Sequence, residues 1–391
     1  MVARDLGASG ALLSSARAAP ASSARGAPAS SARRSAAPAR AQGVERIAVF
    51  RALQLGDLLC AVPALRALRH GFPDARITLI GLPSAAEFVR RFGCYVDDWL
   101  EFPGIAALPE QPARAELLPA FFARARAMRF DLALQMHGSG ERTNSIVRLL
   151  GAQRNVAFGL SAHGPNPDDI VPWPEEGHEI ERLLRITDHL GLPRQGLELE
   201  LPIDELERRR WARLARRRSL DPRRLVLVHP GSRLASRRWP AQRYAALCDR
   251  LSARGWQVAL TGTSEERAIV DAVLAAMHSP AADLCGCTTL GELAAAIESC
   301  RLLVCNDTSV SHVASAVGTR SVVIASGSEI TRWRPLNRLL HSVLATDLPC
   351  RPCADAVCRF DDHPCATAID VERVFELALH HLLPASLPEH A

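Results

Sequence analysis

The 391-residue sequence predicts an α/β protein with two successive units, each a parallel sheet covered by helices. Short apolar runs of strand length alternate with longer stretches of helical periodicity, a pattern typical of parallel sheets. This alternation stops once, near residues 205–222, and then starts again. No apolar run approaches the length of about 20 residues that a transmembrane helix needs. A globular protein of two domains is therefore expected.

In the first unit, each expected strand is a short apolar run, and each expected helix carries apolar residues at helical spacing. Strands are expected at 46–50, 77–80 and 131–135, and helices at 58–70, 117–129 and 144–150. Residues 55–57 are expected to form the turn between the first strand and the first helix. Parallel strands joined through helices in this way place helices on both faces of their sheet.

The second unit repeats this pattern after the interruption. Strands are expected at 225–229, 257–260, 302–305 and 321–325, and helices at 241–254, 265–278, 290–299 and 370–383. The basic stretch 205–218 between the units predicts a helix with a solvated face. Contact of this helix with a phosphorylated glycan or an anionic membrane surface is the alternative.

These observations divide the chain into five segments. They are a low-complexity tail at 1–43, an N-terminal domain at 44–204, a basic linker helix at 205–222, a C-terminal domain at 223–368, and a closing helix and tail at 369–391. The first tail is nearly all Ala, Ser, Arg, Pro and Gly, so it is expected to be disordered and functionally silent. A transit peptide or a misassigned start codon is the alternative.

The net charge of +5 permits an acidic partner but does not require one, and no nucleic-acid partner is expected. All 47 basic residues are Arg, which indicates a compositional bias and makes any single Arg weak support for a site. Seven of the 11 cysteines stand in apolar surroundings, which predicts small buried side chains in a reducing compartment. They are Cys60, Cys94, Cys248, Cys285, Cys287, Cys300 and Cys305.

The most informative motif follows the expected strand at 302–305. Asp307, Thr308, Ser309 and His312 gather hydroxyls, a carboxylate and an imidazole at the point where a helix begins. Free N–H groups at a helix start form a place where a phosphate can bind. An ordinary capped helix is the alternative, since these residue types are good N-caps.

Two further motifs are glycine turns at the ends of strands. In the first, Gly231 lets the backbone approach a ligand, and Arg237 or Arg238 can offer a planar pair of donors to a diphosphate. An ordinary strand-to-helix loop is the alternative. In the second, Glu265 or Glu266 can bind the hydroxyls of a ribose or sugar, or merely complement the helix dipole.

The fourth motif follows the first strand and contains Asp57. A carboxylate at this end of a sheet is either a helix N-cap or a general base. No G-x-G-x-x-G sequence follows the first strand, which disfavours a dinucleotide-dependent oxidoreductase.

In this order, the four motifs resemble glycosyltransferase family 9, the lipopolysaccharide heptosyltransferase family, over about residues 45–383. The opening segment of the family is matched by 55–57 and 63–65, the middle segment by 229–232 and 237–240, and the late segment by 306–316. The resemblance implies a GT-B fold, in which two Rossmann-like domains face an interdomain cleft. It also implies an inverting glycosyltransferase.

The resemblance assigns roles to individual residues. Asp57 matches the general base that deprotonates the acceptor hydroxyl, and Arg237 stands where the family usually has a Lys that neutralises the leaving diphosphate. The donor-binding positions are Gly231, Ser232, Arg233, Gly262, Glu265, Glu266, Asp307, Thr308, Ser309 and His312. Ser309 replaces the Gly of the family, which is costly if the position requires a positive φ or close approach of a ligand. Gly56, His137 and Asn144 are the expected acceptor-binding positions.

The resemblance further implies that heptose passes from ADP-heptose to a lipopolysaccharide core or related lipid-linked glycan, with no cofactor required for catalysis. Such acceptors grow on the inner leaflet, so a cytoplasmic location with peripheral contact to the inner membrane is expected. One alternative is a family 9 enzyme that uses a different nucleotide sugar. Another is a non-catalytic GT-B module that binds nucleotide sugar or glycan.

The remaining four cysteines are clustered at Cys350, Cys353, Cys358 and Cys365. This compact spacing suits a structural zinc or iron ion in tetrahedral coordination, with disulfides or free thiols as the alternatives. Family 9 members often resemble this segment, and a related heptosyltransferase group binds iron through cysteines. A role of the cluster in catalysis is not expected.

Overall fold

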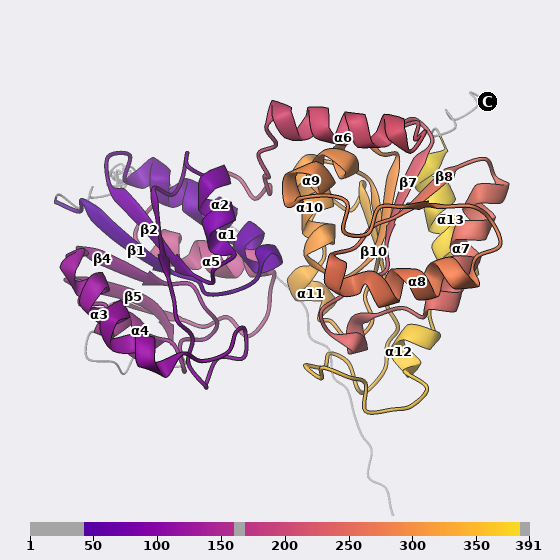
Figure 1. The fold of residues 1–391 in the computed structure, drawn as a ribbon. Coiled ribbons are helices and arrows are strands. Elements are labelled where there is room, and N and C mark those ends of the chain that lie inside the picture. The colour runs from indigo at the N-terminus through magenta and orange to yellow at the C-terminus, as the bar shows by residue number, and fades with distance from the viewer. Residues whose placement is uncertain (1–42, 160–168, 384–391) are drawn as a thin grey trace, which may run out of the picture. The chain divides into compact units, whose positions relative to one another are not determined.

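The computed structural model describes residues 43–159 and 169–383. It contains two six-stranded sheets whose paired strands all run parallel, with helices on both faces of each sheet (Figure 1). The α/β class predicted from the sequence is thus confirmed. The predicted low-complexity tail lies, except for Gly43, outside the described residues.

The first sheet has the strand order β3-β2-β1-β4-β5-β6. Its strands are β1 (Arg46–Phe50), β2 (Arg76–Gly81), β3 (Asp98–Glu101), β4 (Leu132–Gln135), β5 (Arg154–Gly159) and β6 (Ile170–Pro172). Its helices are α1 (Leu55–Gly71), α2 (Ala85–Arg91), η1 (Ala115–Leu117), α3 (Leu118–Ala127), α4 (Asn144–Leu149) and α5 (Glu179–His189).

Strand β1 is buried on both faces because it lies inside the sheet. Ile47 and Val49 pack into the core formed with α1 and α5, whereas Ala48 and Phe50 pack into the core formed with α3 and α4. Successive side chains of a strand point to opposite faces, so a strand covered on both sides needs an unbroken apolar run. This requirement is the reason that the sequence predicted β1 correctly.

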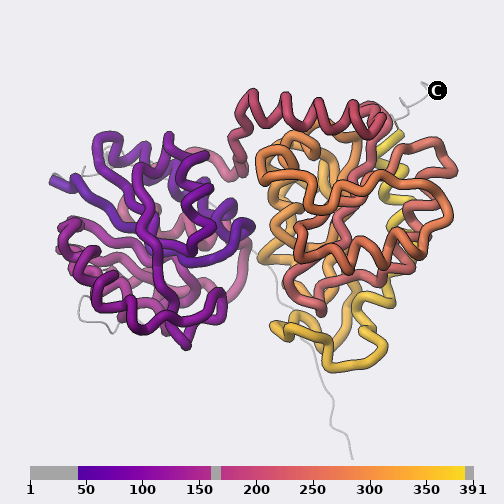
Figure 2. Tube along the Cα trace, viewed as in Figure 1, coloured from indigo at the N-terminus to yellow at the C-terminus, as the bar shows by residue number. Residues whose placement is uncertain are grey.

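The second sheet has the order β12-β11-β10-β7-β8-β9, which is the topology of the first sheet repeated. Its strands are β7 (Leu225–His229), β8 (Gln257–Leu260), β9 (Ala282–Asp283), β10 (Leu302–Asn306), β11 (Ser321–Ile324) and β12 (His341–Leu344). Its helices are η3 (Ala235–Arg237), α7 (Ala241–Ala253), η4 (Ser264–Glu266), α8 (Arg267–Ala276), α9 (Leu290–Ser299), α10 (Ser309–Val317), α11 (Ile330–Trp333), α12 (Pro364–Thr367) and α13 (Val371–Leu382). Figure 2 shows that the chain completes the first sheet before it enters the second.

Helix α6 (Glu205–Arg217) is the predicted basic helix between the two units. It begins with a capping box, in which the Asp204 side chain accepts from the Glu207 N–H and the Glu207 carboxylate accepts from the Asp204 N–H. Trp211 is buried and donates its indole N–H to Ser299 at the end of α9, 2.8 Å away. The apolar face of α6 thus packs on α9, while Arg213 and Arg216 are exposed.

Two sequence expectations are corrected by the structure. Residues 55–57 do not form a turn but the first turn of α1, so the helix begins three residues earlier than expected. Cys94 and Cys287 are exposed, while the other five scattered cysteines are buried as expected. None of the helices in the two described ranges is long and apolar enough to cross a membrane.

Candidate functional site

Both sheets reverse their winding direction between two central strands, β1 and β4 in the first and β7 and β10 in the second. In open α/β sheets, ligands bind at the carboxyl ends of the strands that flank such a point. The motifs with Asp57, Gly231 and Asp307 directly follow three of these strands, and His137 follows the fourth. The topology therefore places Asp57 and His137 at the first of these points, and Gly231 and Asp307 at the second.

Asp57 lies in the first turn of α1, just after β1. It is not an N-cap, because Gln54 occupies that position and its side chain forms no capping hydrogen bond. Burial raises the pKa of the Asp57 carboxyl, while the Arg51 guanidinium opposes the rise. The residue as a whole is half-buried rather than fully buried, so a carboxyl with a raised proton affinity lies within reach of a ligand.

Arg51 is entirely buried and holds the segment around Asp57 in place. Its Nε donates to the backbone oxygen of Asp57 at 2.9 Å, its Nη1 donates to the backbone oxygen of Met136, and its Nη2 donates to Glu179 Oε1 at 3.1 Å. One guanidinium thus connects the start of α1, the end of β4 and the start of α5. Sequence reasoning did not select Arg51, because Arg is abundant throughout this chain.

Glu179 is a second buried charged group; in the sequence it was a weaker candidate, because His178 and Glu179 open a helix as in family members, and it was not among the expected site residues. It is buried at the start of α5 and accepts from Arg51 and, through Oε2, from Arg332 Nε at 2.8 Å. Burial alone would raise the pKa of Glu179, but Arg51 and Arg332 outweigh burial and lower it. Glu179 therefore stays charged.

The three expected acceptor positions have different surroundings. His137 is buried, stacks on Phe50 with ring centres 5.6 Å apart, and places Nε2 3.8 Å from Glu110. The Asn144 amide donates to the backbone oxygen of Phe158 at 2.8 Å, so this side chain bonds to the protein itself. A Cβ at Gly56 would lie 3.0 Å from His312 Cδ2, so Gly56 allows a close approach of α10 to α1.

In the second sheet, the buried side chain of Asn306 joins the ends of β10 and β7. Its Oδ1 accepts from the backbone N–H of Trp239 at 3.0 Å and from the Tyr244 hydroxyl at 2.9 Å. Its Nδ2 donates to the backbone oxygen of Pro230 at 2.8 Å. These bonds fix the loop after β7 relative to the start of α10. Asn306 belongs to the motif but was not among the expected binding residues.

Helix α10 begins within the late motif, and its start is capped, as the alternative of an ordinary capped helix expects. Thr308 is the N-cap, and its hydroxyl accepts from the Val310 N–H at 3.3 Å. Burial lowers the pKa of His312, which favours a neutral imidazole beside Cys60, 3.8 Å from its sulfur. Ser309 is a normal helical residue and not among the positive-φ residues of the described chain, so no backbone cost arises from the missing glycine.

The loop after β7 approaches the second glycine turn closely. A Cβ at Gly231 would lie 2.1 Å from Glu266 Oε1, so only glycine fits there without moving that carboxylate. Glu266 also accepts from the Thr263 N–H at 2.8 Å, whereas Glu265 is exposed. Gly262 packs near Val270, and a Cβ added there would lie 3.1 Å from that side chain. Of the two candidate acids, Glu266 is the one beside the loop.

The two arginines after this loop point to different partners. Arg237 Nη1 lies 4.0 Å from Asp307 Oδ2. Arg238 Nε donates to the backbone oxygen of Ser232 at 2.8 Å and so braces its own loop. Ser232 is buried and Arg233 is exposed. Arg237 is therefore the basic group beside the start of α10.

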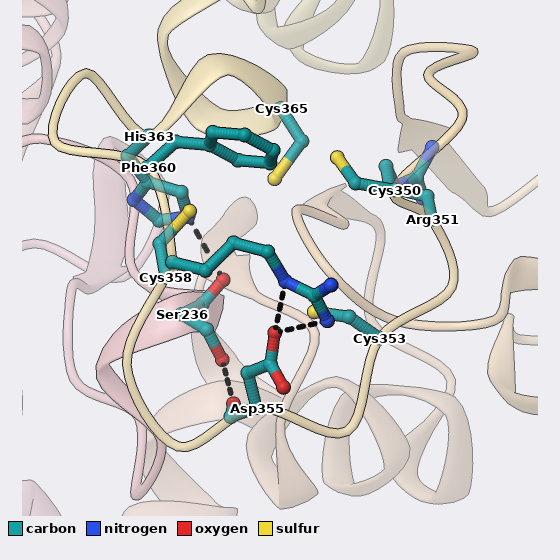
Figure 3. Close-up of a pocket in the computed structure, with 10 residues that line it drawn as sticks. Ser236, Cys350, Arg351, Cys353, Asp355, Cys358, Phe360, His363 and Cys365 are labelled. Atoms are coloured by element: carbon teal, nitrogen blue, oxygen red, sulfur yellow. Dashed lines mark hydrogen bonds and ion pairs between the residues drawn. The ribbon is translucent and has the colours of Figure 1, made fainter.

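The four clustered cysteines line one small pocket together with His363 and Asp355 (Figure 3). Among the described residues, however, no group of three or more His, Cys, Asp or Glu side chains is placed so that it could hold a metal ion. The structure thus brings the sulfurs to one pocket without forming a coordination shell.

The two strand-end sites suit different chemistry. At the first sheet, Asp57 is an accessible carboxylate with a raised pKa, which suits acceptance of a proton. At the second sheet, Arg237 and the N-terminus of α10 offer positive charge and N–H donors, which suit an anion such as a phosphate. A proton acceptor and an anion site are the parts that group transfer from a phosphorylated donor requires.

Comparisons with known proteins identify the family. The family model for glycosyltransferase family 9 (heptosyltransferase) matches residues 120–363. Lipopolysaccharide heptosyltransferase 3 of Escherichia coli is 24% identical over 320 residues, which cover 77% of this chain and 89% of that protein. Lipopolysaccharide heptosyltransferase 2 of Salmonella typhimurium is 31% identical over 120 residues, 29% of this chain and 34% of that protein.

Solved structures share the fold. The family 9 glycosyltransferase of Veillonella parvula has a TM-score of 0.70 at 20% identity, covering 88% of this chain and 99% of that chain. The ADP-heptose lipopolysaccharide heptosyltransferase II of E. coli has a TM-score of 0.67 at 20% identity, covering 86% and 98%. The two-sheet fold is thus GT-B, and the chain belongs to glycosyltransferase family 9 and is a glycosyltransferase.

Proposed function

We propose that this glycosyltransferase transfers heptose from ADP-heptose to a lipopolysaccharide core or a related lipid-linked glycan. The observation that carries the proposal is the Asp57 carboxyl, accessible and with a raised pKa, at the switch point of the first sheet. The choice of sugar is supported by lipopolysaccharide heptosyltransferases that align with this chain over most of their own length.

In the proposed reaction, Asp57 removes the proton of the acceptor hydroxyl, and the oxygen attacks the anomeric carbon. The attack comes from the face opposite the diphosphate, so the new glycosidic bond forms as the bond to the diphosphate oxygen breaks and the configuration inverts. ADP leaves with the bonding electron pair. Arg237 and the N-terminus of α10 stabilise the negative charge on the leaving diphosphate. No cofactor is needed for these steps.

The other donor contacts follow from the loops around Arg237. Gly231, Ser232 and Arg233 form the loop that we assign to the diphosphate, together with Asp307 and Thr308 at α10. Glu266 is assigned to the donor ribose, because it lies against Gly231 while Glu265 is exposed.

The acceptor is assigned to the switch point of the first sheet. Arg51 bonds to the backbone oxygens of both Asp57 and Met136, the residue before His137, which supports a place for His137 beside the acceptor. Asn144 is assigned a structural role, because its amide is bonded to β5. We also propose that the enzyme works in the cytoplasm at the inner membrane, with the exposed arginines of α6 facing anionic lipid or glycan.

A donor screen tests the proposed substrate. With a deacylated lipopolysaccharide acceptor, ADP-heptose is expected to release ADP and yield a heptosylated product that mass spectrometry detects. UDP or GDP release from other nucleotide sugars, without ADP release from ADP-heptose, would show a family 9 enzyme with a different donor. Binding of donors without any turnover would instead indicate a non-catalytic module.

Replacement of the proposed base separates catalysis from binding. Asp57→Asn is expected to lower kcat by about 10²- to 10⁴-fold, the usual contribution of a general base, while the donor Kd stays unchanged. Steady-state kinetics and calorimetric titration with ADP measure the two effects. Asp74→Asn, the same substitution at an exposed carboxylate just before β2, is the control and is expected to keep wild-type kcat. Wild-type kcat in the Asp57→Asn enzyme would refute the assignment.

The pH dependence of kcat/KM reports the ionisation of the base. Asp57 must be deprotonated, and burial raises its pKa, so activity is expected to fall with decreasing pH at a higher pH than for an ordinary Asp. Arg332 lowers the pKa of Asp57, so Arg332→Gln should move this fall to still higher pH. Exposed Arg338→Gln should not move it. A shift to lower pH in Arg332→Gln would contradict the assignment.

A structural metal at the cysteine cluster remains a separate part of the proposal, supported by the four sulfurs that line one pocket. If a metal organises this pocket, elemental analysis of the purified protein will find zinc or iron that is lost from Cys350→Ser/Cys353→Ser. Metal-free wild-type protein with full activity would exclude it.

A further inference from the structure

Arg237 sits at the end of η3, a single 3-10 turn that has little stability of its own. Within this segment, the Arg237 N–H donates to the Leu234 oxygen at 3.0 Å. A group that must meet a diphosphate in one geometry needs firmer support, because misplacement by about 1 Å can cost on the order of 100-fold in rate. The support for η3 has to come from elsewhere in the fold.

The support comes from the segment 350–365, here called the cysteine loop. Ser236, the residue before Arg237, is buried, and each of its hydrogen-bonding groups meets this loop. Its N–H donates to the Ala356 oxygen at 3.2 Å, and its hydroxyl donates to the Asp355 oxygen at 2.5 Å. Its carbonyl oxygen lies 3.0 Å from His363 Nε2 (Figure 3).

The cysteine loop also touches Arg237 itself. Arg237 Nη2 donates to the backbone oxygen of Cys353 at 3.3 Å, on the same guanidinium whose Nη1 lies 4.0 Å from Asp307. The fit is close, because a Cβ at Gly327 would lie 2.7 Å from Cys353 Sγ and 3.7 Å from Arg237 Nε. The guanidinium is therefore held between the loop and the start of α10.

The loop is anchored in turn to the sheet that carries Asp307. The Cys353 N–H donates to the Gly327 oxygen at 2.9 Å. Arg351 Nη2 donates to the oxygens of Ala325 and Ser328, each at 3.1 Å, and the same guanidinium bonds to the oxygens of Ser326 and Thr346. Residues 325–328 directly follow β11, the neighbour of β10. The loop thus links η3 to the same sheet edge as Asp307.

We propose that the cysteine loop positions Arg237 for the leaving diphosphate, with Ser236 and His363 as the positioning residues that connect the loop to η3. The inference rests on the proposed function, in which Arg237 neutralises that diphosphate. It gives the loop a role in the transfer step that the sequence did not predict. The four cysteines then matter to catalysis through the shape of the loop, not through contact with substrate.

A double-mutant cycle between Ser236→Ala and Arg237→Ala tests this coupling. Ser236→Ala removes the hydroxyl bond to the loop and is expected to lower kcat on the order of 10-fold in the wild-type background, with a smaller change in the donor KM. In the Arg237→Ala background, the same change should leave kcat unaltered, because the group that the loop positions is already absent. Thermal unfolding of all variants checks that they are folded.

The controls separate positioning from stability. Ser252→Ala on α7 also removes a hydroxyl from the second domain and is expected to leave kcat unchanged in both backgrounds. His363→Gln keeps a side-chain donor and should retain more activity than His363→Ala. If Ser236→Ala lowers kcat by the same factor with and without Arg237, the loop acts through stability alone and the inference fails. If Arg237→Ala itself keeps wild-type kcat, the proposed role of Arg237 fails instead.

Discussion

The buried guanidinium of Arg51 is the interaction on which the first half of the site depends. A charge with no exposed surface is tolerated only when its donors are bonded and a counter-charge is near. Glu179 supplies that charge, and the backbone oxygens of Asp57 and Met136 accept the other donors. Loss of one partner from such a buried pair typically costs about 3–5 kcal/mol. The pair therefore fixes where β1 ends, where α1 begins and how α5 approaches them.

In the second sheet, a neutral side chain rather than a buried charge joins the segments that follow the central strands. The Asn306 amide bonds to the loop after β7 and to Tyr244 and Trp239, so no buried charge is needed there. A neutral link leaves the positive charge of Arg237 and the N-terminus of α10 available for a ligand. This contrast matches the chemistry proposed for each sheet, a proton acceptor at the first and a phosphate site at the second.

The agreement between sequence and structure was best where one face or both faces of an element are buried. Strands β7 and β8 and helix α9 occur with the expected bounds, because their apolar patterns reflect packing on a sheet. Edge strands such as β3 and β9 were not predicted, since short half-buried strands carry a weak pattern. The expected turn at 55–57 was wrong because the Leu58 N–H donates to the Gln54 oxygen at 3.0 Å and closes a helical turn over these residues, although no side-chain cap marks the start.

The fold class, the four strand-end motifs and the family follow from the amino-acid sequence, because they depend on local patterns of apolar residues and glycine turns. The packing of distant segments distinguishes Glu266 from Glu265 beside Gly231, and Arg237 from Arg238 beside Asp307. It also brought together Arg51 with Glu179 and the cysteine loop with Ser236, pairs more than a hundred residues apart. Such contacts depend on how distant segments pack, and neighbouring residues of the same type cannot be distinguished until that packing is known.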